Sequence, residues 1–190
     1  MIIGIGGTNG AGKDTVAQLL VETYGFMFAG ATEMFVAELQ KRGWPTDREH
    51  KSKLSAEWRR EMGMSAIVDK ALAAYDAEPV GKYKGLAVGS LRHPGEVDRV
   101  HELKGIVLWI DADPQIRYQR ISSGNRGRGL EDDKTYEVFL AEEQREMTPT
   151  GDAATLNMSA VKERADKILF NNSSDLTELS AELAKILESL

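Results

Sequence analysis

The residue pattern with the clearest chemistry lies at the start of the chain. The apolar run Ile2–Ile5 leads directly into GGTNGAGKDT, residues 6–15, and apolar residues then recur at helical spacing from Val16. Glycines let the backbone turn tightly, so that several N–H groups can point at one polyphosphate. The positive end of the helix dipole and the charge of Lys13 also favour an anion. This order of strand, glycine-rich loop and helix predicts a P-loop, or Walker A motif, which binds nucleotide phosphates.

The P-loop interpretation has an alternative, and the motif departs from the usual pattern at one position. The alternative is a turn that only joins a strand to a helix. Four glycines within residues 6–12 and a lysine at the helix start argue against this alternative. Asp14 stands where a Ser or Thr usually contacts Mg²⁺, and the hydroxyl comes one residue later at Thr15. Asp14 and Thr15 are therefore the predicted metal ligands. The predicted phosphate-binding residues are Gly7, Thr8, Asn9, Gly10, Ala11, Gly12, Lys13, Asp14 and Thr15.

A group of arginines lies between residues 114 and 130, a stretch without any acidic residue. Guanidinium groups bind phosphate in bidentate geometry, so residues 122–132 are interpreted as a lid loop that closes over a transferring phosphoryl group. The alternative is a solvated basic loop balanced by the acidic residues 131–133. The arginines of this group are Arg117, Arg120, Arg126 and Arg128.

Three further arginines are candidates for binding a second anion. Arg92 follows the predicted strand at 86–88 and lies near a helix start, where a cation is poorly placed unless an anion is bound. We therefore predict that Arg92 contacts the substrate. Arg48 and Arg59 are three helical turns apart on roughly one face of a predicted helix, and they are weaker candidates because a solvated face explains them equally well.

Composition narrows the class of protein. The chain has 190 residues, 42% of them apolar and 28% charged, which suits a single globular domain over 1–190. A net charge of −6 argues against non-specific nucleic-acid or membrane binding. The absence of cysteine excludes disulfides and thiol chemistry. The first predicted strand leaves no room for a signal peptide and no apolar run approaches a membrane span, so a cytoplasmic location is expected.

Apolar runs alternate with helical patterns along the chain, which predicts a parallel sheet covered by helices on both faces. A helical insertion is expected at 32–78. Thr46 with Glu49 can form a capping box for a helix over Asp47–Met62, Pro94 can occupy the first turn of a helix over Gly95–Leu103, and Ser173 or Ser174 can cap the last helix. The predicted strands are Ile2–Ile5, Phe26–Ala29, Leu86–Val88, Ile106–Ile110 and Lys167–Phe170.

Taken together, these motifs resemble the P-loop nucleoside monophosphate kinase superfamily, and most closely its dephospho-CoA kinase-like and deoxynucleotide kinase-like branch. The resemblance runs along nearly the whole chain. It is carried by Gly12–Ala17, by Tyr24–Phe26, by Arg92 with Pro94, Glu96 and Val97, by Asp111–Pro114 with Arg117 and Arg120, and by Ala165-Asp166 leading to Asn171.

The resemblance implies a three-layer α/β/α P-loop NTPase fold with a five-stranded parallel sheet, a helical substrate-binding insertion and a short lid. It implies ATP with Mg²⁺ as the donor, bound on the P-loop, and an acceptor phosphate held by Arg92. The catalytic set is then Lys13, Arg92, Arg120 and Arg126; Arg117 and Asn171 join the ATP-binding residues; and Arg48, Arg59, Arg92 and Arg128 form the acceptor set.

Three departures from the family pattern bear on function. Val36 stands about where relatives often have an arginine, which weakens the expected grip on an acceptor phosphate. The Gly-Ser pair at 89–90 stands where relatives often carry an acid, so Asp14 or Asp111 is expected to support Mg²⁺ instead. The segment 30–33 offers one acid where dephospho-CoA kinases usually have Asp-x-Asp, which favours a nucleotide acceptor.

The leading functional hypothesis is ATP-dependent phosphotransfer to a small acceptor, a nucleoside or deoxynucleoside monophosphate. Dephospho-CoA kinase activity is the alternative within the same class, and an ATPase or nucleotide switch without a small-molecule acceptor is the alternative from another class. Phosphorylation of a nucleic-acid end is disfavoured by the acidic net charge. A monomer or a small homo-oligomer is expected.

Overall fold

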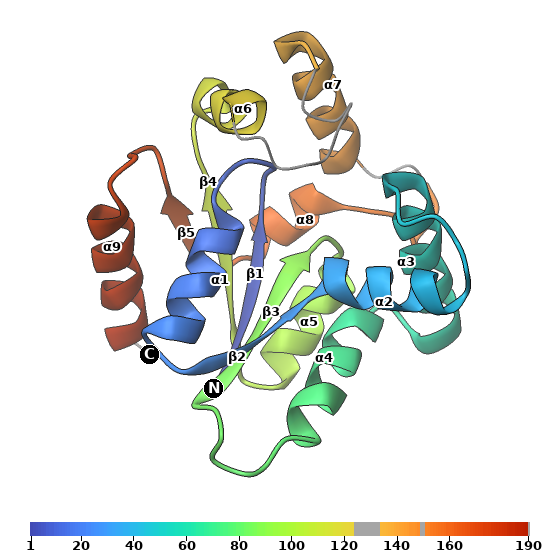
Figure 1. The fold of residues 1–190 in the computed structure, drawn as a ribbon, viewed down its shortest axis with the longest axis horizontal. Coiled ribbons are helices and arrows are strands. Elements are labelled where there is room, and N and C mark those ends of the chain that lie inside the picture. The colour runs from blue at the N-terminus through green and yellow to red at the C-terminus, as the bar shows by residue number, and fades with distance from the viewer. Residues whose placement is uncertain (124–133, 149–150, 190) are drawn as a thin grey trace.

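The structure is a computed structural model, and it describes residues 1–123, 134–148 and 151–189. Within these residues, parallel strands form a five-stranded sheet in the order β2-β3-β1-β4-β5 (Figure 1). The predicted strands are confirmed, and four of them extend further than predicted. Their bounds are β1 Ile2–Gly7, β2 Phe26–Gly30, β3 Gly85–Leu91, β4 Ile106–Asp111 and β5 Lys167–Phe170.

Helices cover both faces of the sheet, which confirms the three-layer α/β/α prediction. On one face, α1 and α9 pack against the side chains of Ile3, Ile5 and Leu108. On the other face, α4, α5 and α8 pack against Val88 and Trp109. The helices are α1 Lys13–Glu22, α2 Ala31–Lys41, α3 Arg48–Met62, α4 Ala66–Asp76, α5 Pro94–Glu102, α6 Pro114–Ser123, α7 Tyr136–Met147, α8 Met158–Glu163 and α9 Leu176–Glu188.

Successive residues of each central strand therefore belong to two different hydrophobic cores. In β4, Val107 and Trp109 face one core and Leu108 and Ile110 face the other, and all four side chains are fully buried. Side chains alternate across a strand, so a strand covered on both faces must be apolar throughout. This is why an unbroken apolar run predicted β4 correctly, whereas the edge strand β5 is less covered, with Ile168 45% and Phe170 60% exposed.

Two predicted helix caps are wrong by one or two residues. Helix α3 is capped by Asp47, whose carboxylate accepts a hydrogen bond from the His50 backbone N–H at 2.9 Å, and not by Thr46. Helix α9 is capped by Asp175, not by Ser173 or Ser174. Several good capping residues stand side by side at both places, so the packing of the helix decides which residue caps it.

The predicted insertion at 32–78 is helical and consists of α2, α3 and α4. Phe35 of α2 and Trp58 of α3 pack together with ring centroids 5.2 Å apart, which holds these two helices as a unit. The predicted lid at 122–132 falls mostly on residues 124–133, which lie outside the described residues; residues 122 and 123 end α6. In the part of the chain that is described, no helix is long and apolar enough to cross a membrane.

Candidate active site

The P-loop connects β1 to α1 through glycines that no other residue can replace without strain. Gly7, Gly10 and Gly12 have φ angles of 143°, 81° and 97°. A Cβ atom at Gly7 would lie 2.2 Å from the Ile110 carbonyl oxygen, and one at Gly12 would lie 2.3 Å from Nδ2 of Asn171. Helix α1 begins after Gly12, which has no side chain that could cap it. The first turn of a helix presents backbone N–H groups and the positive end of the helix dipole, so a cradle of this shape fits nucleotide phosphates.

Lys13 and the segment after β5 hold the P-loop in shape. The Lys13 ammonium donates to the carbonyl oxygens of Gly7 at 3.0 Å and Thr8 at 2.7 Å. Asn171 donates from Nδ2 to the Ala11 carbonyl oxygen at 2.8 Å. The structure thus places Lys13 and Asn171 against the same loop, as their predicted membership of one site requires.

Arg120 acts on this region from α6. Its guanidinium donates to the carbonyl oxygens of Asn171 and Ser173, both at 2.8 Å. These contacts fix the segment after β5 that contains Asn171, one of the predicted ATP-binding residues. Contact between Arg120 and a transferring phosphoryl group stays a prediction.

Asp111 at the end of β4 forms the polar centre behind the P-loop. Its carboxylate accepts hydrogen bonds from the Thr8 hydroxyl at 2.9 Å, from the Lys162 ammonium at 2.9 Å and from the Trp109 indole at 3.2 Å. Burial favours the neutral acid, but the hydrogen bonds from Lys162, Thr8 and Trp109 prevail and lower the pKa of Asp111. Lys162, on α8, was not predicted, because a lone lysine in a short helix carries no motif.

Arg117 lies between the P-loop and α7. Its side chain is 3% exposed and donates to the carbonyl oxygens of Ala112 at 2.8 Å and Asn9 at 3.3 Å. Both terminal nitrogens also pair with the Glu143 carboxylate. In this structure Arg117 therefore joins α7 to the P-loop, and its predicted contact with ATP stays a prediction.

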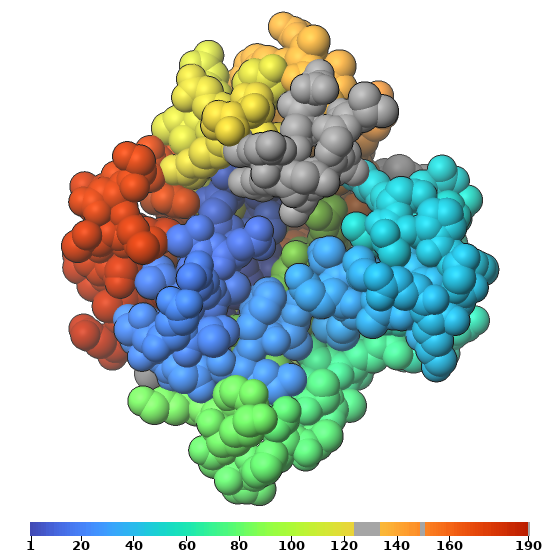
Figure 2. Space-filling model, viewed as in Figure 1, coloured from blue at the N-terminus to red at the C-terminus, as the bar shows by residue number. Residues whose placement is uncertain are grey.

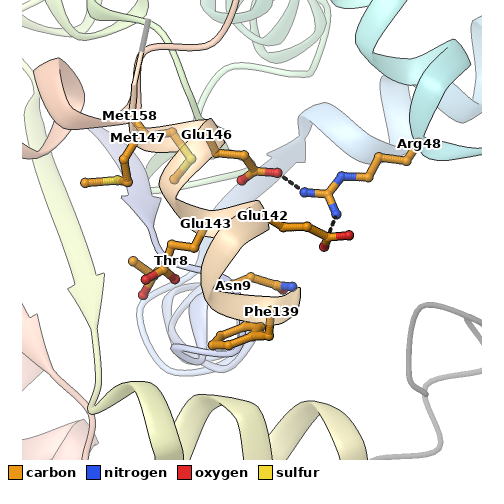
Figure 3. Close-up of a pocket in the computed structure, with 9 residues that line it drawn as sticks. All are labelled: Thr8, Asn9, Arg48, Phe139, Glu142, Glu143, Glu146, Met147 and Met158. Atoms are coloured by element: carbon orange, nitrogen blue, oxygen red, sulfur yellow. Dashed lines mark hydrogen bonds and ion pairs between the residues drawn. The ribbon is translucent and has the colours of Figure 1, made fainter. Parts of the chain in front are cut away.

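Two of the predicted acceptor-binding arginines meet on α7. The guanidinium of Arg92 lies 3.1 Å from Oε2 of Glu146, and that of Arg48 pairs with Glu142 at 3.2 Å and also with Glu146. Arg48 comes from α3 and Arg92 follows β3, so the fold brings together residues that are 44 positions apart, from 48 to 92. Figure 3 shows Arg48 reaching toward the glutamates of α7.

Arg59 is placed elsewhere, although it shares α3 with Arg48. Its side chain is 2% exposed and pairs at 2.7 Å with Glu96, which is 0% exposed. It also donates to the Ala154 carbonyl oxygen at 3.2 Å. The structure therefore does not bring Arg59 together with Arg48 and Arg92. Arg126 and Arg128 lie outside the described residues.

A pocket next to the P-loop is lined by one face of α7 together with Arg48 (Figure 3). The molecular surface is hollowed between α1 and α2, with α6 and α7 above (Figure 2). The residues that line the pocket are Thr8, Asn9, Arg48, Phe139, Glu142, Glu143, Glu146, Met147 and Met158.

Sequence reasoning missed α7 altogether. The glutamates at 142, 143 and 146 fall on one face of this helix, and this pattern was the available signal.

Oxygen ligands for a metal are sparse in the described ranges. Nowhere among them do three His, Asp or Glu side chains gather closely enough to hold a metal ion together. Asp14 and Thr15 lie in the first turn of α1, beside the phosphate cradle. Mg²⁺ prefers few protein ligands together with phosphate oxygens and water, so these two residues fit an ion that arrives with a nucleotide. Their role as metal ligands stays a prediction.

His93 should make the stability of this region depend on pH. Its Nδ1 accepts a hydrogen bond from the Gly95 N–H at 3.0 Å, and its Nε2 lies 2.7 Å from the Ala153 carbonyl oxygen, which fits a neutral ring. Burial lowers the pKa of His93, although the Ala153 carbonyl opposes this shift. The unfolded chain then binds the proton more readily, so the free energy of unfolding should fall as pH drops below about 6.5.

Urea unfolding of the wild type and His93→Asn between about pH 7.5 and pH 5.5 tests this, since Asn keeps a capping acceptor but does not titrate in this window. The advantage of the wild type over the variant should shrink toward low pH. Parallel pH curves for the two proteins would show that His93 does not contribute.

The parallel sheet, the glycine-rich loop after β1 and the lysine that opens α1 define a P-loop α/β protein. A family model for the AAA domain matches residues 3–147, so the chain belongs to this family. A comparison with curated protein sequences finds no match.

Solved structures of similar fold include three shikimate kinases. The enzyme from Bacteroides thetaiotaomicron aligns with a TM-score of 0.61 at 14% identity, over 99% of this chain and 98% of that one. The enzyme from Aquifex aeolicus aligns with a TM-score of 0.59 at 16% identity, over 100% and 97%. The enzyme from Acinetobacter baumannii, in complex with shikimate, aligns with a TM-score of 0.54 at 18% identity, over 99% and 93%. At these identities the likeness shows the fold alone.

Proposed function

We propose that this protein is an ATP-dependent phosphotransferase that moves the γ-phosphoryl group of ATP to a small phosphate-bearing acceptor. The preferred acceptor is a nucleoside or deoxynucleoside monophosphate, and dephospho-CoA is the alternative. The observation that carries the proposal is the glycine-rich turn between β1 and α1, in which Gly7, Gly10 and Gly12 have positive φ angles and Lys13 opens the helix, with Arg48 beside the adjoining pocket. One end of the site suits a polyphosphate, and the arginines near its other end suit a second anion.

On the donor side, the chain supplies position and charge. Backbone N–H groups of the P-loop and the ammonium of Lys13 would hold the β- and γ-phosphates while negative charge shifts toward the leaving oxygen. Mg²⁺, when bound with ATP, would supply further charge neutralisation on the phosphate oxygens, and Asp14 and Thr15 are the residues that would hold it. The Asp111 network keeps Thr8, and with it the loop, in place.

On the acceptor side, Arg92 and Arg48 are the groups suited to a phosphate. They come from different elements and converge from α3 and from the end of β3, and the carboxyl edge of a parallel sheet is where ligands bind in such folds. Arg59 pairs with buried Glu96, so it supports the position of this region rather than offering a third charge. The acceptor proposal therefore depends on Arg92 and Arg48.

The proposal is tested by measuring ADP release from Mg-ATP with and without a panel of acceptors. The panel holds nucleoside and deoxynucleoside monophosphates, dephospho-CoA and shikimate, the last because shikimate kinases share the fold. Release that depends on one phosphate-bearing acceptor supports the proposal. ADP release that does not depend on an acceptor supports an ATPase or a nucleotide switch instead. The pairing of Arg48 and Arg92 with glutamates of this chain is compatible with that alternative, because these arginines already have an anionic partner. Strict dependence on shikimate contradicts a phosphate acceptor.

Replacement of Arg92 should affect mainly the acceptor. We expect Arg92→Ala to raise the KM for the acceptor about tenfold or more, because a charge-assisted contact to phosphate is lost, while the KM for ATP changes little. Arg164→Ala removes an exposed arginine that pairs with Asp98 and serves as the control. Steady-state kinetics with each substrate varied provides the measurement. An effect confined to ATP would place Arg92 on the donor side.

A further inference from the structure

Glu146 of α7 lies where the two acceptor-side arginines meet. Its Oε2 is 3.1 Å from the guanidinium of Arg92, and its Oε1 pairs with the guanidinium of Arg48. The Glu146 side chain is 15% exposed, whereas those of Arg48 and Arg92 are 45% and 34% exposed. A carboxylate shared by two guanidinium groups uses the same donors that would grip a phosphate.

The pairing belongs to a wider arrangement on the same helical face. Glu142 pairs with Arg48 and Lys134, and Glu143 pairs with Arg117, whose guanidinium also donates to the Asn9 carbonyl oxygen of the P-loop. Helix α7 is therefore positioned from the P-loop side and from the acceptor side at once. The acidic face of α7 also lines the pocket beside Thr8 and Asn9. Glu146 is therefore one of the residues that line the pocket, and its ion pairs with the arginines form there.

Building on the proposed function, we propose that Glu146 is the internal occupant of the acceptor-phosphate site. An acceptor phosphate binds by exchanging with the Glu146 carboxylate on Arg92 and Arg48. Glu146 thereby lowers the affinity of the site for anions. Only a ligand that binds the two arginines more strongly than the Glu146 carboxylate does can occupy the site. Glu142 also lines the pocket, and its carboxylate pairs with the ammonium of Lys134 at 2.7 Å.

The inference is tested with inorganic phosphate while the P-loop is filled by Mg²⁺ and an unreactive ATP analogue. Phosphate binding is measured by calorimetry on the wild type, on Glu146→Gln and on Glu137→Gln. The control removes the same charge from the same helix at an exposed residue whose partners are Thr135 and its own backbone. We expect Glu146→Gln to bind phosphate about five- to tenfold more tightly than the wild type, and Glu137→Gln to match the wild type.

A double variant shows whether the added affinity arises at the proposed site. In Glu146→Gln/Arg92→Ala the gain should be smaller than in Glu146→Gln, because one of the two guanidinium groups that Glu146 contacts is gone. Equal phosphate affinity of Glu146→Gln and the wild type, or a gain that stays undiminished without Arg92, overturns the inference and leaves the proposed function standing. Failure of the ATP analogue to bind overturns both. Thermal unfolding of each variant confirms that the comparison is made between folded proteins.

Discussion

Lys13→Ala should lower the rate of phosphotransfer by about 10³-fold or more. The ammonium of Lys13 lies within 3.0 Å of two P-loop carbonyl oxygens, so it both shapes the cradle and brings a positive charge to the place where phosphates would lie. Loss of a single charge-stabilising donor in an active site typically lowers the catalytic rate by about 10²–10³-fold, and a full positive charge contributes more. Acceptor-dependent ADP release under saturating Mg-ATP gives the measurement.

The matched control is Lys53→Ala, because Lys53 is an exposed lysine of α3 that pairs with Glu49 on its own helix. This variant should retain the wild-type rate. Nucleotide binding and thermal unfolding of Lys13→Ala separate a loss of catalysis from a loss of structure. A folded Lys13→Ala protein with near wild-type turnover would contradict the assignment of the P-loop as the donor site.

Arg59→Met should lower the free energy of unfolding by about 3–5 kcal/mol, because removal of one member of a buried ion pair leaves the other charge without compensation. Glu96 is 0% exposed and would lose its guanidinium partner in the core. Methionine retains most of the side-chain length, so the effect reports on the charge more than on a cavity. Urea unfolding at neutral pH measures it.

The neighbouring arginine provides the control for this stability effect. Arg60 pairs with Asp152 at the surface, where the two side chains are 56% and 46% exposed. Exposed pairs contribute about 0–1 kcal/mol, so Arg60→Ala should change stability little. Equal effects of Arg59→Met and Arg60→Ala would show that burial of the Arg59–Glu96 pair is unimportant.

Replacement of Arg59 should also weaken binding of the acceptor at the proposed acceptor site. Glu96 accepts hydrogen bonds from the backbone N–H groups of Arg92 at 2.7 Å and His93 at 3.2 Å, so it holds the turn from which the Arg92 side chain extends. A displaced Glu96 would shift that turn. We therefore expect a higher acceptor KM in Arg59→Met together with the loss of stability.

Local pattern was sufficient for the strands and for the glycine-rich loop. The central strands were predicted because a doubly covered parallel strand must be apolar at every position, as Val107–Ile110 shows. The P-loop was predicted because its glycines, its lysine and the start of α1 are contiguous in sequence. Helix caps were predicted less well, since Thr46 and Asp47 are both suitable and only the packed helix selects Asp47.

The partners of the arginines could not be predicted in this way. Arg48 and Arg59 share one helix and one residue type, yet the first meets Glu146 at the pocket and the second is buried against Glu96. These partners lie 98 and 37 positions away in the chain. The acidic face of α7 was missed for the same reason, because charged residues at helical spacing ordinarily indicate a solvated surface.

By itself, the sequence determined the parallel α/β architecture and the position of the glycine-rich loop, because backbone preference and burial act over short stretches of chain. Tertiary structure alone decided which charges meet: Asp111 with Lys162, Arg117 with Glu143, and Glu146 with Arg48 and Arg92. Electrostatic pairing depends on distance and burial in space, and neither quantity can be obtained from the order of residues until the sheet and its helices have brought distant segments together.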